Sequence, residues 1–252
     1  MTKQNPDNGS IISIEHFTMQ FGDTVVVNNV SFDVKKGETF GLLGSNGSGK
    51  TTTLRCLLGI YPATHGRLHV NGGPFNVDGS IKIGYLPEER GLYKKESVID
   101  TMVYFGRLKG LSASEAADWS MAYLKRVGLA DKGKTRLDKL SGGQQQKVQL
   151  GVTIMNNPEL LILDEPTKGF DPVNRRLLMD IIEEHQQMGA TVVYVSHDMA
   201  EVERLCDRII LLGEGSVKEY GTVAEVRKRH GNASLDEIFV ELYGKEAEVS
   251  NA

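Results

Sequence analysis

The sequence predicts an α/β fold with an N-terminal antiparallel β-subdomain and an inserted α-helical subdomain. Apolar and polar residues alternate through residues 12–34, strand-like apolar runs stand at 160–163 and 191–195, and helical periodicity fills residues 97–157. The chain has 252 residues, 40% of them hydrophobic. That size suits one globular domain with its own core.

The N-terminal segment is expected to form half-buried antiparallel strands. Turn signals at residues 21–23 and 35–38 separate its apolar runs, and short strand patterns with glycines recur between residues 66 and 86. The alternating residues are Ile12 and Ile14, then Val25 and Val27, then Val30, Phe32 and Val34.

The following elements alternate between strand and helix. "TFGLLGSNGSGKTTTLRCLLG" (39–59) predicts a strand, a glycine-rich turn and a helix. Strand patterns return at 159–166 and 191–198 around a helical pattern at 177–189, and such a β-α-β unit implies parallel strands. Residues 207–221 predict a hairpin turning at 213–215, and the tail from Val223 is helical. We expect one domain over 1–245, with the helical subdomain at about 90–157 inserted in the α/β core, and a polar tail at 246–252.

Composition excludes several classes of protein. The net charge of -4 provides no basic field for nucleic acid, so no nucleic-acid partner is predicted. Two cysteines, Cys56 and Cys206, are too few for a disulfide framework, and we expect reduced, buried thiols. No run approaches the roughly 20 apolar residues of a membrane helix. We therefore expect a cytoplasmic protein that another chain holds at any membrane where it works.

Residues 44–51, "GSNGSGKT", fit the phosphate-loop pattern G-x-x-x-x-G-K-[ST] between a strand and a helix. Its glycines let backbone N–H groups converge on phosphate oxygens, and the helix N-terminus adds its positive dipole end. Lys50 would reach the β and γ phosphates, and Thr51 would hold Mg²⁺. The predicted nucleotide-binding residues are Gly44, Ser45, Asn46, Gly47, Ser48, Gly49, Lys50, Thr51 and Thr52.

A second motif, "LLILDEP" (160–166), places two acids at the carboxyl end of a buried parallel strand, where α/β sheets bind ligands. Asp164 would hold Mg²⁺, directly or through water, and Glu165 would polarise the attacking water as a general base. Together the two motifs predict a nucleotide triphosphatase that uses ATP and Mg²⁺ on a P-loop NTPase core with a RecA-like mixed sheet.

The string "LSGGQQQKVQL" (140–150) narrows this class, because with it the chain resembles the ATP-binding cassette family from about Ile12 to Tyr243. The resemblance implies that two cassettes pair head to tail with each ATP between the phosphate loop of one and LSGGQ of the other. We expect a homodimer, because every motif is intact here, and a mixed dimer is the alternative. It assigns the trans contact to Ser141, Gly142, Gly143 and Gln144. Ser141 is also a suitable helix N-cap, although a cap alone does not explain two glycines.

The resemblance implies further roles. Phe21 would stack on adenine, His197 in "VSHDM" would contact the γ-phosphate and help hold the attacking water, and Asp171 would communicate across the dimer. Phe170 stands where the family more often has leucine. The alternative for Phe21 is a core residue of an edge hairpin.

Glu88 departs from the family pattern, because a glutamine that senses Mg²⁺ or water near the γ-phosphate usually follows "GYLP". A carboxylate about 4 Å from a phosphate charge would cost about 4 kcal/mol at an effective dielectric of 20. Glu88 is thus expected to ligate Mg²⁺ when the site closes. The alternatives are that it turns to a basic group such as Arg90, or that it only serves the interface with the membrane partner.

The stretches "YLPEERGLY" (85–93) and "SLDEIFVELYG" (234–244) resemble cassettes of bacterial export systems. The implied function is the ATPase subunit of an exporter, peripheral at the inner face of the cell membrane through a polytopic permease. A DNA-repair or ribosomal cassette is the alternative. Those classes carry a long coiled coil, a zinc insertion or two cassettes, none of which is seen here.

Overall fold

The chain forms two compact units. The computed structural model describes residues 9–76, 81–89, 91–93 and 95–249, with the side chains up to residue 244. The first unit joins the segment up to Ile81 to the segment from Thr191, and the second is Lys82–Ala190.

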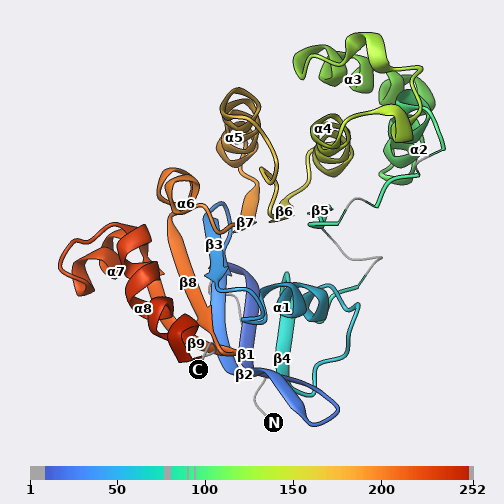
Figure 1. The fold of residues 1–252 in the computed structure, drawn as a ribbon. Coiled ribbons are helices and arrows are strands. Elements are labelled where there is room, and N and C mark those ends of the chain that lie inside the picture. The colour runs from blue at the N-terminus through green and yellow to red at the C-terminus, as the bar shows by residue number, and fades with distance from the viewer. Residues whose placement is uncertain (1–8, 77–80, 90, 94, 250–252) are drawn as a thin grey trace. The chain divides into compact units, whose positions relative to one another are not determined.

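An antiparallel sheet opens the first unit. It consists of β1 (Ser10–Phe21), β2 (Thr24–Lys35) and β4 (His65–Val70) in the order β2-β1-β4 (Figure 1). Ile12 pairs with Val34 and Ile14 with Phe32, and all four are buried. The predicted antiparallel strands are therefore confirmed. The two apolar runs at 25–34 both lie on one strand, β2. The register of β2 against β1 shifts near Asn29, whose backbone has a φ of 52°.

The second sheet of this unit is mixed. Its strands β7 (Thr191–Val195), β3 (Thr39–Gly44), β8 (Arg208–Gly213) and β9 (Ser216–Thr222) follow in that order, with β3 parallel to β7 and β8. The predicted hairpin is β8–β9, which pair antiparallel. Every residue of β3 and β7 is buried, as expected for strands covered on both faces.

The helices of the first unit are α1 (Lys50–Leu57), α6 (Met199–Leu205), α7 (Val223–Arg229) and α8 (Leu235–Val249). Helix α1 follows β3 and contacts β2, β3 and β4. Cys56 and Cys206 are buried and free, as predicted. Helix α6 was not predicted, because seven residues are too few for a helical period to stand out.

The second unit combines a parallel strand pair with the predicted helical region. Strand β5 (Ile83–Leu86) pairs parallel with β6 (Leu160–Asp164). The helices are α2 (Val98–Leu108), α3 (Ala113–Arg126), α4 (Gly142–Ile154) and α5 (Pro172–Gln187), with short 3-10 turns at Ala130–Lys132 and Leu137–Lys139. The helical pattern at 97–157 divides where Ser112 and Ser141 cap new helices through capping boxes.

Candidate active site

Glycines shape the loop between β3 and α1 in the first unit. Gly44 has φ 149°, and a Cβ there would lie 2.1 Å from the Leu212 carbonyl oxygen. Gly49 has φ 99°, and a Cβ there would lie 2.7 Å from Val27 Cγ2. Only glycine fits such positions without strain, so neighbouring strands and the backbone together fix the path of the loop.

The first turn of α1 differs from the starts of the neighbouring helices. Gly49 is its N-cap residue; within the described residues no side chain caps α1, and no acid stands in its first turn. In helices α2 to α7, the side chain of the N-cap residue accepts a hydrogen bond from a backbone N–H of the first turn. These N-cap residues are Ser97, Ser112, Ser141, Asp171, Asp198 and Thr222. The start of α1 thus keeps its positive dipole end without a resident side-chain acceptor, which fits a phosphate group.

Lys50 lies over this loop. Its Nζ donates to the carbonyl oxygens of Gly44 at 2.8 Å and Ser45 at 2.9 Å. Ser48 Oγ is buried and has no hydrogen-bond partner among the described residues. Asn46 and Gly47 are exposed at the tip of the loop, while Thr51 and Thr52 are half-buried in the first turn. An ammonium group and an orphan hydroxyl beside an uncapped helix fit the polar donor set that a phosphate requires.

Phe21, at the end of β1, is 43% exposed, and its ring meets Tyr61 edge-on with centroids 5.7 Å apart. The Arg55 guanidinium lies 6.0 Å from the Tyr61 ring centroid. Phe21 is therefore not a core residue of the hairpin, and its exposure suits a stacking role.

His197 is exposed just after β7, and its neighbours are held by a buried carboxylate that sequence reasoning missed. Glu201 Oε2 accepts from the Tyr194 hydroxyl at 2.7 Å and from Ser196 Oγ at 3.2 Å. The Asp198 N–H in turn donates to Ser196 Oγ at 3.0 Å. In the sequence, the signal for this carboxylate is an acid that follows His197 by about one helical turn.

The two acids at the carboxyl end of β6, in the second unit, have different surroundings. Asp164 is 2% exposed, while Glu165 is half-buried with φ 51°. A non-glycine residue in that conformation costs about 1–3 kcal/mol and is typical of functional sites. The turn continues with the Lys168 N–H donating to the Glu165 carbonyl at 3.2 Å.

Glu88 pairs with a residue that was not predicted. Its Oε1 lies 2.6 Å from Lys168 Nζ. This hydrogen bond, together with the charges of Glu88, Glu165 and Asp164, raises the pKa of Lys168 above its ordinary value. Arg90, the basic partner considered from sequence, lies outside the described residues. Lys168 could be noticed in the sequence only as a cation three residues after Glu165.

The N-terminus of α4 is capped by its own side chains. Ser141 Oγ accepts from the Gln144 N–H at 3.3 Å, and the Ser141 N–H donates to Gln144 Oε1 at 3.0 Å. A Cβ on Gly143 would lie 3.3 Å from the ring of Phe170, which is 7% exposed. The phenyl ring at 170 therefore packs against the second glycine of the string. Gly142 and Gly143 are both half-buried.

Asp171, next to Phe170, caps α5. Its Oδ1 accepts from the backbone N–H groups of Val173 at 2.9 Å and Asn174 at 3.0 Å. These bonds, the backbone N–H of Asn174 first, lower the pKa of Asp171.

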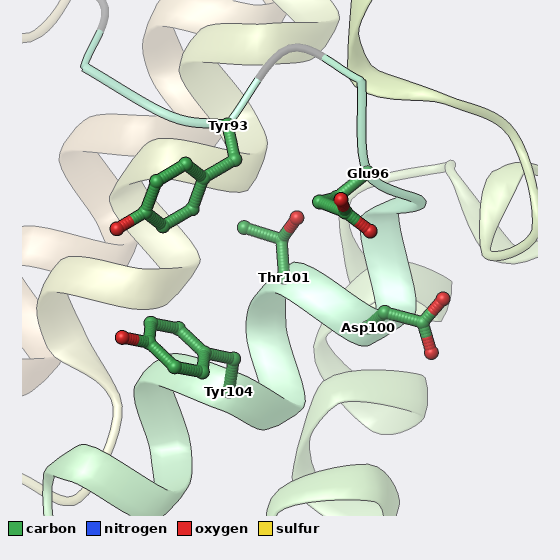
Figure 2. A pocket seen from close by; sticks show the side chains of 5 residues that line it. All are labelled: Tyr93, Glu96, Asp100, Thr101 and Tyr104. Carbon is green, nitrogen blue, oxygen red and sulfur yellow. The ribbon is translucent and has the colours of Figure 1, made fainter.

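Aromatic residues line a pocket of about 440 Å³ in the second unit. Figure 2 shows the rings of Tyr93 and Tyr104 on one side of Thr101, with Glu96 and Asp100 on the other. Thr101 is 2% exposed, and its Oγ1 has no hydrogen-bond partner among the described residues. The pocket therefore offers aromatic faces, two carboxylates and one unpaired hydroxyl.

Within the described ranges, no group of three or more His, Cys, Asp or Glu residues could hold a metal ion. No helix in the described part of the chain is long and apolar enough to cross a membrane.

Comparison with known proteins finds a family and individual proteins that are similar to this chain. Residues 27–168 match the family described as ABC transporter. An ABC transporter ATP-binding protein of Methanocaldococcus jannaschii is 44% identical over 218 residues, covering 86% of this chain and 80% of that protein.

Two further relatives have more specific names. The linearmycin resistance ATP-binding protein of Bacillus subtilis is 35% identical over 91% of this chain and 75% of its own length. A Nod factor export ATP-binding protein of Rhizobium sp. is 36% identical over 87% of this chain and 73% of its own length. A solved structure of an ATP-binding subunit of an ABC transporter superposes with a TM-score of 0.85 at 30% identity, covering 92% of this chain and 99% of that one.

Proposed function

The chain belongs to the ABC transporter family as an ATP-binding subunit, and from this premise we propose that it hydrolyses ATP with Mg²⁺ to drive export through a separate permease. The observation that carries the proposal is the glycine-shaped, uncapped start of α1 beside the Lys50 ammonium. A cassette acting in DNA repair or on the ribosome finds no support in relatives that are named as transporter subunits.

In the nucleotide site, residues 44–52 bind the phosphates of ATP and Phe21 stacks on its base. The loop offers backbone donors, and Lys50 supplies a positive charge whose Nζ donates to the carbonyl oxygens of Gly44 and Ser45. Base stacking on an aromatic ring is worth about 1–3 kcal/mol. The half-exposed ring of Phe21 supports this role.

For hydrolysis, Thr51, Asp164 and Glu88 are the proposed ligands of Mg²⁺, which supplies Lewis-acid stabilisation of the phosphate charge when bound. Glu165 accepts the proton of the attacking water, and His197 orients that water and the γ-phosphate. The left-handed backbone of Glu165 fixes the direction in which its carboxylate leaves β6. Glu201 holds the backbone on both sides of His197 through Ser196.

We propose that two copies of the chain form a homodimer around two ATP molecules. Ser141, Gly142, Gly143 and Gln144 contact the nucleotide of the partner copy, and Asp171 lies on the segment that links this contact to α5. The packing of Phe170 on Gly143 joins the two segments and supports their acting together. Hydrolysis cleaves the γ-phosphate, and its departure as inorganic phosphate removes contacts that bind the copies, so they separate.

We propose that the permease binds the second unit at the pocket formed by α2 and by Tyr93 and Glu96, which precede this helix. The pocket of Figure 2 exposes two tyrosine rings and two carboxylates there, a surface suited to a permease segment with apolar and basic side chains. Such an attachment would hold the chain at the inner face of the membrane. The relatives named for Nod factor export and linearmycin resistance support outward transport. We propose no nucleic-acid partner, given the net charge of -4.

The experiment that tests this function measures ATP binding and hydrolysis by the full chain and by Lys50→Ala. We expect Mg²⁺-dependent phosphate release by the wild type and at least a tenfold loss of ATP affinity in the variant, because the ammonium beside the loop is lost. Unchanged ATP binding by Lys50→Ala would contradict the phosphate-loop assignment. Co-purification of the chain with a polytopic membrane protein, followed by identification of that protein, tests the permease proposal.

A further inference from the structure

The ion pair between Glu88 and Lys168 joins two segments that the proposed function places in the metal site. Lys168 Nζ lies 2.6 Å from Glu88 Oε1, and the Lys168 N–H bonds to the carbonyl oxygen of Glu165 at 3.2 Å. The ammonium therefore sits on the turn that carries the proposed general base. The charges of Asp164 and Glu165 also act on it, and they contribute to the raised pKa of Lys168.

Helix α4 fixes the backbones on both sides of this ion pair. Gln149 Nε2 donates to the Glu89 carbonyl at 3.2 Å, and Gln146 Nε2 donates to the Pro166 carbonyl at 3.4 Å. Gln146 and Gln149 are both buried, so these tethers come from a fixed surface. The two segments are thus held by one helix, and the pairing of Glu88 with Lys168 follows from the packing of the unit.

The side chains themselves remain free to separate. The Lys168 side chain is 60% exposed and that of Glu88 is 42% exposed. An exposed pair of this kind is worth little, so a competing cation can break it. A carboxylate oxygen that ligates a metal ion also gives up much of its strength as an acceptor for an ammonium group, and the two cations repel each other.

We propose that Lys168 and the divalent cation compete for the carboxylate of Glu88. Lys168 holds Glu88 in the metal-free protein, and the cation displaces it, so Lys168 is a positioning residue that sets how readily Glu88 becomes a ligand. This inference rests on the proposed function, and it gives a reason for an acid at position 88. A neutral glutamine would not attract the ammonium group by charge, so Lys168 would have little effect on the affinity for the cation.

The test is a titration of Mn²⁺ into the full chain with the non-hydrolysable nucleotide AMP-PNP, followed by electron paramagnetic resonance. It compares the wild type, Lys168→Met, Glu88→Gln and the double variant. Exposed ion pairs are weak, so their loss is expected to change affinity by about two- to fivefold. We expect Lys168→Met to tighten Mn²⁺ binding by that factor, Glu88→Gln to weaken it, and Lys168→Met to have at most about a 1.5-fold effect in the Glu88→Gln background.

Lys132→Met is the matched control, because it removes another exposed lysine of the same unit, which pairs with Asp131 at 2.9 Å. It should leave Mn²⁺ binding unchanged. An equal effect of Lys168→Met with and without Glu88 would overturn the competition and show that Lys168 acts only as a diffuse charge. Weaker Mn²⁺ binding by Lys168→Met, or no change, would also overturn it. A wild type that binds neither nucleotide nor Mn²⁺ would instead contradict the proposed function.

Discussion

Helices α1 and α4 both begin in glycine-rich segments assigned to phosphate, yet their first turns are built differently. Helix α1 starts at Gly49 without a side-chain cap, whereas α4 starts at Ser141 with a complete capping box to Gln144. The start of α1 therefore gains an acceptor when a phosphate arrives. The start of α4 is already capped by its own side chains, and in the proposed homodimer it presents Gly142 and Gly143 to the partner copy.

The glycines of the two segments also differ in backbone conformation and in the room that each has for a Cβ. Gly49 has φ 99° and no room for a Cβ, whereas Gly143 lies in α4 without a positive φ, and a Cβ there would make a tight contact of 3.3 Å with the Phe170 ring. The first glycine is required by the backbone of its own loop. The second lets the Phe170 ring pack closely against α4. The following variants test this contrast.

The largest expected effect comes from Gly49→Ala compared with Gly143→Ala. Gly49→Ala should lower the free energy of unfolding by about 1–3 kcal/mol, because it forces a strained conformation and a clash with Val27. It should also lower ATP affinity at least tenfold. In Gly143→Ala, a gain of about 1 kcal/mol in helix propensity offsets the contact with Phe170, and ATP binding by the single chain should persist.

Urea unfolding and fluorescence titration with a labelled ATP analogue measure both quantities. Equal losses of stability and of ATP affinity in the two variants would remove the contrast between the helices.

Ser141→Ala should have a smaller effect. Loss of the N-cap should lower the free energy of unfolding by about 0.5–2 kcal/mol, and Ser141→Asp should retain most of it, because aspartate also caps helices. ATP binding to the isolated chain should be unaffected. Urea unfolding of both variants provides the measurement, and a full loss of stability in Ser141→Asp would indicate that the serine acts by something other than capping.

The smallest expected effect concerns the self-capped start of α5. The pKa of Asp171 in the folded chain lies below its ordinary value of 3.8, so its stabilising contribution is present above that value and is lost as the pH falls through the folded pKa. Asp171→Asn should therefore be less stable than the wild type at pH 7, and the difference should shrink at about pH 3. Urea midpoints at the two pH values measure it. A difference that grows in acid would reverse the sign of the argument.

Local patterns predicted much of this molecule. The alternation at Ile12 and Ile14, the glycines around Lys50 and the cap at Ser141 each depend on residues close in sequence, and the structure contains the corresponding strands, loop and helix. The roles assigned to the site residues stay predictions.

Other features depend on contacts between distant segments, and no single-sequence pattern contains them. Lys168 meets Glu88 across 80 positions of sequence, and Phe170 meets Gly143 from the segment between β6 and α5. The left-handed backbone of Glu165 and the buried carboxylate of Glu201 are likewise set by tertiary packing. From the sequence alone, a metal ion, Arg90 and the membrane partner are therefore the neighbours expected for Glu88, and Lys168 is missed.

The most direct measurement of the central claim is the oligomeric state and turnover of Glu165→Gln with ATP and Mg²⁺. Light scattering after size exclusion should show an ATP-dependent dimer, and phosphate release should fall by at least a hundredfold, because binding groups remain while the proton acceptor is lost. Wild-type turnover by Glu165→Gln, or a variant that stays monomeric when saturated with ATP, would contradict the account.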